Sequence, residues 1–230
     1  MPTKPTVLVF DVNETLIDLA SLEPFFAARF GDVSVMRQWF AELIVYAEAV
    51  ALSEIYVPFG ALAKGCLRMV GDIRGVEITE EDAAELGRLI GSMPPHPDVA
   101  PALDRLASAG FRMVTLTNSA SGSSPSPLEK AGLAYFFERA FTVEATERFK
   151  PARVTYDHVS RELGRGPEEL CLVACHVWDT IGAQAAGWQA GLLMRPGNAV
   201  LKVDGVPRPT FVADDLGALT DMLLDLPARD

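Results

Sequence analysis

Two carboxylates follow closely on an apolar run near the start of this 230-residue chain. The stretch LVFDVNETLID places Asp11 directly after residues 8–10, and Glu14 follows within one turn of chain. A short run of large apolar residues predicts a strand buried on both faces, so Asp11 stands where that strand leaves its sheet. A carboxylate in such a place can serve as a nucleophile or as a general base.

Polar and charged residues follow other apolar runs in the same way. Thr117 and Asn118 come directly after residues 113–116. A further set comes after residues 170–174 and comprises Cys175, His176, Trp178 and Asp179. The carboxyl ends of parallel strands meet at one edge of an open sheet, where ligands bind. We therefore expect these groups to converge there with Asp11 and with Lys150, which precedes a predicted helix.

The apolar runs predict the sheet that would position these residues. They alternate with helix-like segments, which is typical of a parallel sheet with helices on its faces. The runs occupy residues 7–10, 113–116, 141–143, 170–174 and 192–194. Three of the intervening helices have recognisable ends. One at 99–109 stops at Gly110, one at 151–163 begins with Pro151, and one at 183–186 stops at Gly187.

The interval between the first two runs is different, because it contains amphipathic segments and no convincing strand. Residues 35–50 form one such segment, and Thr79 with Asp82 resembles a capping box that opens a helix at 80–90. The sequence Met-Pro-Pro-His-Pro at 93–97 cannot continue a helix, so it closes the insertion like a hinge.

This organisation predicts an α/β protein with two domains. We expect a Rossmann-like parallel sheet core of residues 1–16 and 96–230, with an inserted helical cap domain of residues 17–95. Residues 119–127, SASGSSPSP, are expected to form a small polar loop of the core.

The composition excludes several classes of protein. With 49% apolar and 22% charged residues, the chain is expected to be globular. The formal charge of −11 argues against nucleic acid and anionic membranes as partners, so a few local cations must hold any anionic substrate. The absence of a leader-like start or a long apolar stretch predicts a soluble, cytoplasmic protein. The cysteines lack C-x-x-C spacing and are expected to be reduced thiols: Cys66, Cys171 and Cys175.

Four of these positions together resemble the motifs of the haloacid dehalogenase superfamily. Its motifs are a strand-end Asp nucleophile, a strand-end Ser or Thr, a Lys and a final acidic motif. They match Asp11, Thr117, Lys150 and Asp179, in that order. The resemblance covers nearly the whole chain, and it implies that the helical insertion is the cap.

Two positions distinguish this chain from the phosphatases that form most of that superfamily. Those enzymes carry a second Asp two residues after the nucleophile and a magnesium-binding acid four residues before the last one. Here these positions are Asn13 and Cys175. A carboxamide cannot donate and recover a proton as a carboxylic acid does, and a thiol is a poor ligand for magnesium. We therefore expect no metal and no cofactor.

The chain looks more similar to the L-2-haloacid dehalogenase branch of the superfamily. The similarity lies in Arg37 of the first cap helix and in Asn118, Tyr156 and Trp178 near the motif residues. It implies that Asp11 attacks the carbon bearing the halogen, that the halide leaves toward an Arg/Asn cradle, and that water then cleaves the aspartyl ester. A homodimer is also implied by the resemblance.

The chain departs from that branch at two motifs. Where the branch usually has Asp-x-Tyr-Gly-Thr, this chain has Asp-Val-Asn-Glu-Thr at 11–15, and where it usually has Ser-x-Asn, this chain has Ala-Cys-His at 174–176. A carboxylate can hold one imidazole nitrogen while the other takes a proton from water. We therefore expect Glu14 and His176 to form the pair that activates water.

The candidates also have structural interpretations, which compete with the functional ones. Capping or turn formation would explain Asp11, Thr15 and Thr117, and a solvated loop would explain Glu14. Arg37 could form a surface salt bridge. Packing is the simplest role for Tyr56, Phe59 and Trp178, although they could line an apolar halogen pocket. Two histidines are interpreted as structural, His96 and His158.

The predicted function is hydrolytic dehalogenation of short (S)-2-haloalkanoic acids to (R)-2-hydroxy acids. The expected catalytic residues are Asp11, Glu14, Thr15, Thr117, Lys150, His176 and Asp179. The expected substrate- or halide-binding residues are Arg37, Asn118, Asn13, Tyr156 and Trp178. Two alternatives remain, a magnesium-dependent small-molecule phosphatase of the same superfamily and a catalytically silent binding protein on this scaffold.

Overall fold

A parallel sheet of six strands lies at the centre of the computed structural model, which describes residues 2–120 and 125–227. The strands are β1 (Val7–Phe10), β2 (Arg112–Thr117), β3 (Arg139–Thr142), β4 (Leu170–Ala174), β5 (Gln189–Leu193) and β6 (Phe211–Ala213). Their order is β3-β2-β1-β4-β5-β6, and every neighbouring pair is parallel. The predicted α/β class with a parallel sheet is confirmed.

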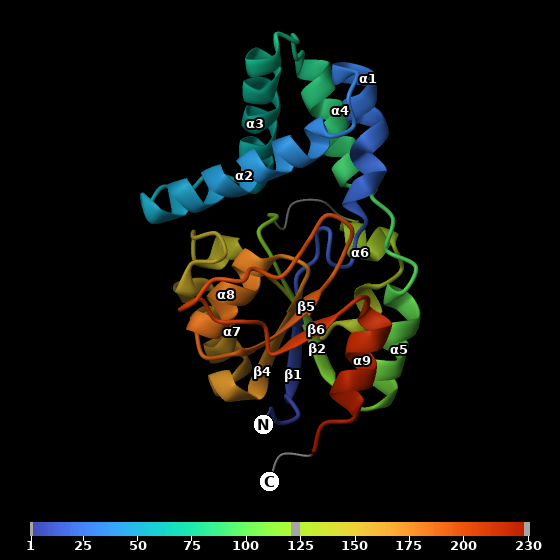
Figure 1. Cartoon of the computed structure of the whole chain (residues 1–230), viewed down its shortest axis with the longest axis vertical. Helices are drawn as coiled ribbons and strands as arrows, with labels where there is room; N and C mark the ends of the chain where they lie inside the picture. The colour runs from blue at the N-terminus through green and yellow to red at the C-terminus, as the bar shows by residue number, and fades with distance from the viewer. Residues whose placement is uncertain (1, 121–124, 228–230) are drawn as a thin grey trace.

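Helices cover both faces of the sheet, and four more lie beyond the carboxyl ends of its strands (Figure 1). The covering helices are α5 (Val99–Ser108) and α9 (Leu216–Leu224) on one face, and α7 (Arg153–Leu163) and α8 (Val177–Ala185) on the other. A short helix, α6 (Pro127–Lys130), follows β2. The 3₁₀ turns span Leu19–Leu22, Ala134–Phe136, Val143–Ala145 and Pro167–Glu169.

The four helices beyond the sheet form what we call the helical insertion. They are α1 (Glu23–Phe30), α2 (Val35–Leu52), α3 (Phe59–Arg74) and α4 (Glu80–Ile90), and all come between β1 and β2 in the chain. The predicted capping box opens α4, since Thr79 Oγ1 accepts from Asp82 N at 3.2 Å and Asp82 Oδ2 accepts from Thr79 N at 2.9 Å.

The chain enters and leaves the helical insertion side by side. Asp18 N donates to Pro94 O at 2.7 Å, and His96 N donates to Leu16 O at 2.9 Å. Ile17 forms an antiparallel bridge with Pro95 between these two bonds. The two crossing segments therefore behave as one short ribbon that carries the insertion above the sheet.

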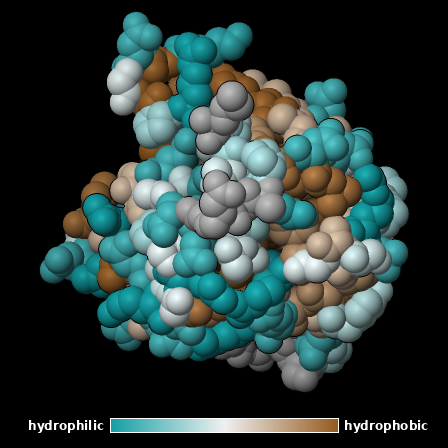
Figure 2. Space-filling view, turned by 90° about the horizontal axis from the view of Figure 1, so that it is seen from below, coloured by the Kyte–Doolittle hydropathy of each residue, from teal (hydrophilic) through white to brown (hydrophobic). Residues whose placement is uncertain are grey.

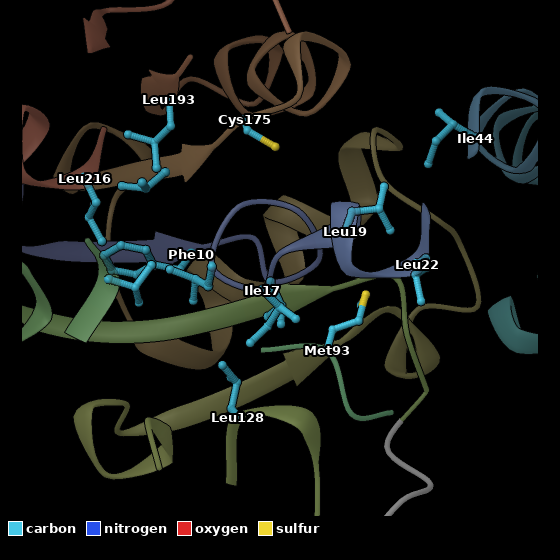
Figure 3. Packing of buried hydrophobic residues seen from close by; sticks show 14 of the residues in the cluster. Phe10, Ile17, Leu19, Leu22, Ile44, Met93, Leu128, Cys175, Leu193 and Leu216 are labelled. Carbon is cyan, nitrogen blue, oxygen red and sulfur yellow. The ribbon is translucent and has the colours of Figure 1, made fainter. Parts of the chain in front are cut away.

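The central strand β1 contributes side chains to both sides of the sheet, because successive residues of a strand point to opposite faces. Leu8 and Phe10 belong to a core cluster shared with α5 and α9, whereas Val7 and Val9 belong to one shared with α7 and α8. The first cluster is continuous with the helical insertion, as its labelled members Leu19 and Ile44 illustrate (Figure 3). The core and the insertion therefore share apolar packing.

Several element boundaries differ from those predicted. Helix α7 begins at Arg153 instead of Pro151, because the chain first makes a turn in which Ala152 N donates to Phe149 O. Strand β5 begins at Gln189, where polar and glycine residues hide the strand pattern. Helix α8 already begins at Val177. Residues 121–124 of the predicted polar loop lie outside the described residues.

The end of the molecule opposite the helical insertion presents a mostly hydrophilic surface, with hydrophobic residues gathered toward one side (Figure 2). Within the described ranges, no helix combines the length and the apolar character that crossing a membrane requires. The polar groups predicted to do chemistry lie at the other end of the strands, beneath the insertion.

Candidate active site

Asp11 lies at the carboxyl end of β1 with its carboxylate held from several sides. It is only 4% exposed, and its Oδ2 accepts from Thr15 Oγ1 at 2.7 Å while its Oδ1 accepts from Lys150 Nζ at 2.8 Å. Burial alone would raise the pKa of Asp11, but the charges of Lys150 and His176 outweigh it and lower the pKa below its ordinary value. Asp11 is therefore an ionised carboxylate in a nearly dry place.

Lys150 is a fully buried cation shared by two carboxylates. Besides Asp11, its Nζ donates to Asp179 Oδ2 at 2.5 Å and to Leu116 O at 3.0 Å. Burial opposes the charge, yet Asp11 and Asp179 together raise the pKa of Lys150. Its backbone N donates to Asn118 Oδ1 at 2.9 Å, which fixes the start of the segment that carries it. Lys150 thus supplies the positive charge that stabilises ionised Asp11.

Tyr156 lies beside the second carboxylate that holds this cation. Its hydroxyl donates to Asp179 Oδ1 at 2.6 Å, and its side chain is wholly buried. Burial and the neighbouring carboxylate of Asp179 raise the pKa of Tyr156 well above its ordinary value, so the phenol keeps its proton and remains a donor. Tyr156 thus orients Asp179, which in turn holds Lys150, and the substrate contact expected of Tyr156 stays a prediction.

His176 lies between two carboxylates. Its Nε2 is 2.8 Å from Glu14 Oε2, and its Nδ1 is 3.2 Å from Asp11 Oδ2. The Nδ1 contact lacks hydrogen-bond alignment, and among the described residues this buried nitrogen has no hydrogen-bond partner. The imidazole ring stacks on Trp178, with the ring centroids 5.0 Å apart. The predicted convergence of Glu14 and His176 is therefore present, with a free ring nitrogen beside the nucleophile.

The charge state of His176 depends on these neighbours. Burial would lower the pKa of the imidazole, but the thiol of Cys175 and the carboxylates of Asp11 and Glu14 together raise it well above its ordinary value. Burial also raises the pKa of Cys175, so this thiol is neutral and the two carboxylates supply the negative charge. While Asp11 is ionised, the raised pKa of His176 favours the protonated imidazolium.

Glu14 has a left-handed backbone, with φ at +63°, which is costly for a residue with a Cβ. Its surroundings hold this conformation, since Glu14 O lies 2.9 Å from His96 Nε2 and its carboxylate contacts His176 and Arg37. Burial opposes its ionisation, but these two cations lower the pKa of Glu14. His96, interpreted from the sequence as structural, therefore positions the backbone of a candidate catalytic residue.

Arg37 joins the helical insertion to the core. From α2 it forms a close ion pair with Glu14, and its Nη2 donates to Pro196 O at 2.8 Å. A Cβ added at Gly197, where φ is +88°, would approach the guanidinium at 3.2 Å, so this turn requires glycine. Arg37 was expected in a halide cradle, and here it is paired with Glu14, the carboxylate that contacts His176.

Two further predicted residues, Thr117 and Asn13, form hydrogen bonds with Ser119. Thr117 Oγ1 accepts from Ser119 N at 3.1 Å, whereas Thr15 Oγ1 donates to Asp11 Oδ2, so the catalytic role expected of Thr117 stays a prediction. Asn13 Nδ2 donates to Ser119 Oγ at 3.1 Å, which links the ends of β1 and β2. Thr117 and Asn13 therefore shape the loops around the nucleophile.

Arg195 is a buried residue of this region that the sequence analysis missed. Its Nε and Nη2 donate to Thr15 O at 3.2 and 2.9 Å, and its Nη1 donates to both carboxylate oxygens of Asp98 at 2.9 and 3.0 Å. The signal was available, because Arg195 directly follows a predicted strand, as the recognised candidates do. Arg195 fixes the turn that presents Asp11 and Thr15.

Among the residues that the structure describes, one group of side chains could hold a metal ion. Ligand atoms of Glu14, Cys175 and His176 all lie within 4.8 Å of one another. Magnesium prefers oxygen ligands, so a thiol and an imidazole do not suit it. A softer ion would have to displace Arg37 from Glu14 and separate Glu14 from His176. The residues present therefore fit a proton-transfer pair better than a metal centre.

Comparison with known proteins gives concordant results. A family model described as haloacid dehalogenase-like hydrolase matches residues 5–187. The (S)-2-haloacid dehalogenase of Pseudomonas fluorescens is 25% identical over 94% of this chain and 96% of its own length. That of Xanthobacter autotrophicus is 27% identical over 82% of this chain and 74% of its own length.

Solved structures show the same fold. The L-2-haloacid dehalogenase of Xanthobacter autotrophicus with chloropropionic acid covalently bound superposes with a TM-score of 0.86, at 22% identity over 97% of this chain and 100% of the other. Another L-2-haloacid dehalogenase superposes with a TM-score of 0.90, at 23% identity over 96% of this chain and 99% of the other.

Proposed function

This chain belongs to the haloacid dehalogenase-like hydrolases, and on that premise we propose that it hydrolyses the carbon–halide bond of (S)-2-haloalkanoic acids. The products are the (R)-2-hydroxy acid and halide. One observation carries the proposal: a buried, ionised Asp11 lies beside a histidine whose free nitrogen faces it and whose other nitrogen contacts Glu14. These are the parts that a displacement on carbon followed by ester hydrolysis requires.

The first step is attack of an Asp11 carboxylate oxygen on C2 of the substrate. The new C–O bond forms as the carbon–halogen bond breaks, the halide leaves with the bonding electrons, and the configuration at C2 inverts. Lys150 and Thr15 hold the carboxylate in place for this attack. Arg37 and Asn118 are the proposed partners of the anions, so Arg37 must exchange Glu14 for the substrate or the halide.

The second step uses the change in charge that the first one produces. Once Asp11 is an ester, the negative charge beside His176 Nδ1 is gone, so the pKa of the imidazole falls and the ring can lose its proton to solvent. Neutral His176 then takes a proton from water through Nδ1, while Nε2–H donates to Glu14. The hydroxide adds to the Asp11 carbonyl carbon, and the bond from this carbon to the substrate oxygen then breaks. That oxygen takes the remaining proton of the attacking water, so the hydroxy acid leaves and ionised Asp11 and protonated His176 are restored.

The helical insertion corresponds to the proposed cap domain of residues 17–95 on a core of residues 1–16 and 96–230. Support comes from α1–α4, which lie above the strand ends and deliver Arg37 to Glu14. The cytoplasmic location and the homodimer implied by the family resemblance stay predictions.

The competing functions lack specific support at these positions. A phosphatase of this superfamily needs a general acid and a magnesium ligand where Asn13 and Cys175 stand. A silent binding protein has no need for a dry carboxylate between Lys150 and His176, since burying such charges is costly.

The test is halide release from the separate enantiomers of 2-chloropropionate with excess chelator. We expect turnover of the (S)-enantiomer, no loss of rate with chelator, and slower or no hydrolysis of phosphate esters. A single turnover in heavy-oxygen water should label Asp11 and release hydroxy acid with unlabelled oxygen. Chelator-sensitive phosphate release would support the phosphatase instead, and labelled hydroxy acid from the first turnover would show that water attacks the substrate directly.

A further inference from the structure

A cavity of about 500 Å³ lies between the helical insertion and the strand ends. Its walls are mostly apolar and include Trp39, Phe40, Leu43, Phe59, Leu86 and Ile90. Pockets of roughly 300–1,000 Å³ accommodate ligands of drug size. The methyl side chain of 2-chloropropionate would leave most of this space unfilled.

The floor of the cavity adjoins the catalytic groups. Asn13 and Ser119 form part of it and are joined by a hydrogen bond, and Asn13 lies two residues after Asp11. Phe40, in the wall, places its ring 5.5 Å from the ring of His176. A substituent on C2 of a substrate held at Asp11 can therefore extend past Asn13 into apolar surroundings.

The outer part of the cavity is open and carries positive charge. Lys64, Arg88 and Lys130 line the cavity and are exposed, and Lys130 Nζ donates to Gly91 O at 2.7 Å. In a chain with a formal charge of −11, three cations at the mouth favour the entry of an anion with an apolar body.

We propose that the preferred substrates are 2-haloalkanoic acids with an extended apolar substituent, such as a hexyl or benzyl group, which occupies this cavity. The inference rests on the proposed dehalogenase function and names its substrate class. Each methylene transferred from water into the cavity should raise kcat/KM about threefold to fourfold until the space is filled.

The experiment measures halide release from four substrates, the (S)-2-bromo derivatives of propionate, butanoate, hexanoate and octanoate. We expect kcat/KM to rise along the series, and (S)-2-bromo-3-phenylpropionate to exceed the propionate. Binding can be measured apart from turnover with the unhalogenated acids. Octanoate should inhibit competitively at a lower concentration than propionate. Halide release that is constant or falls with chain length overturns this inference and leaves the dehalogenase function standing. No halide from any member overturns both.

Two glycines in the cavity wall offer positions from which a larger side chain can fill it. A Cβ added at Gly60 or Gly87 meets no atom within 4 Å, and both residues lie in helices, where glycine is unfavourable. The ratio of kcat/KM for 2-bromooctanoate to that for 2-bromopropionate should fall about tenfold or more in Gly60→Leu and in Gly87→Leu. Gly65→Leu, also in α3 with open space but away from the cavity, should leave that ratio unchanged. Equal ratios in all three variants would overturn the assignment of the cavity.

Discussion

Glu14 combines an unfavourable backbone conformation with a position between two cations. Its φ of +63° would suit glycine, yet its carboxylate contacts both Arg37 and His176. Strained residues persist where the surrounding structure determines them, and they concentrate at functional sites. The chain therefore carries a charged side chain at a position whose backbone conformation favours glycine.

The strain at Glu14 can be measured with two truncations. Glu14→Ala and Glu14→Gly both remove the carboxylate, but only glycine adopts positive φ without a steric cost. We expect the glycine variant to have a free energy of unfolding about 1 kcal/mol larger than the alanine variant. Urea unfolding of the two proteins decides it, and an alanine variant that is the more stable would show that position 14 relaxes out of the left-handed region.

His176 should act after the nucleophile has reacted. His176→Ala should release one halide per site and then accumulate an Asp11 adduct, because ester cleavage loses its base while ester formation does not. Glu14→Gln should accumulate less of it. Mass analysis of the Asp11 peptide after rapid quenching measures the adduct, and normal turnover without an adduct would remove His176 from the mechanism.

The same residue predicts how activity depends on pH. Proton uptake by His176 in the ester intermediate removes the base, so kcat should fall as pH decreases through the pKa of this imidazole. Loss of the Asp11 charge moves that pKa down from its raised value in the free enzyme toward the reference value of ~6.5, while the contact with Glu14 still acts to raise it. A kcat profile across pH 5 to 9, roughly spanning that value, tests this, and a flat acid limb would contradict it.

At the scale of elements, Arg195 ties three parts of the core together. It follows β5, donates to Thr15 O in the loop after β1, and pairs with Asp98, whose Oδ2 also accepts from Leu216 N at the start of α9. Asp98 itself immediately precedes α5. The loop that presents the nucleophile is therefore held by helices on one face of the sheet.

Arg195→Met should lower the free energy of unfolding by about 2 kcal/mol at neutral pH, since Asp98 and Thr15 O lose a charged donor. Burial opposes ionisation of Asp98, but Arg195 lowers its pKa, so this stabilisation exists above ~3.9 and is lost as pH falls through the depressed value. Urea unfolding at neutral and acid pH measures it. The control Arg153→Met, at an exposed pair with Asp157, should cost less than about 0.5 kcal/mol, and an equal cost would contradict the role of Arg195.

Patterns that depend on local sequence were predictable at this scale. Strand β4 and helix α4 have the predicted bounds, because a continuous apolar run and a capping box are local signals. Strand β6 was not predicted, since it is short and its middle residue is exposed. The convergence of Asp11, Lys150 and His176 followed from the places of Asp11 and His176 at strand ends and of Lys150 before a predicted helix. The partners of Tyr156 and Arg37 depend on packing between distant segments.

At the scale of the molecule, Arg37 connects the two proposed domains through Glu14 and Pro196 O. Arg37→Ala should lower kcat/KM about 30-fold, equivalent to ~2 kcal/mol, because a charge-assisted contact to the substrate anion is lost. It should also speed hydrogen exchange in α2. Arg68→Ala, which removes an exposed ion pair with Glu80 within the insertion, is the control and should leave both unchanged. Near-native kcat/KM for Arg37→Ala would place the anion site elsewhere on the insertion.

The paired crossing segments beneath the insertion have a consequence for how such proteins diversify. Asp18 is hydrogen-bonded to Pro94 and Leu16 to His96, so the two ends of the helical insertion are joined to each other where they leave the core. The entropy of closing a loop grows only slowly with its length, by about 0.6 kcal/mol per doubling. Replacement of the segment between these hydrogen bonds, by recombination or by design, would therefore leave Asp11 and Lys150 in place. The new segment would supply a different cavity for other substrates.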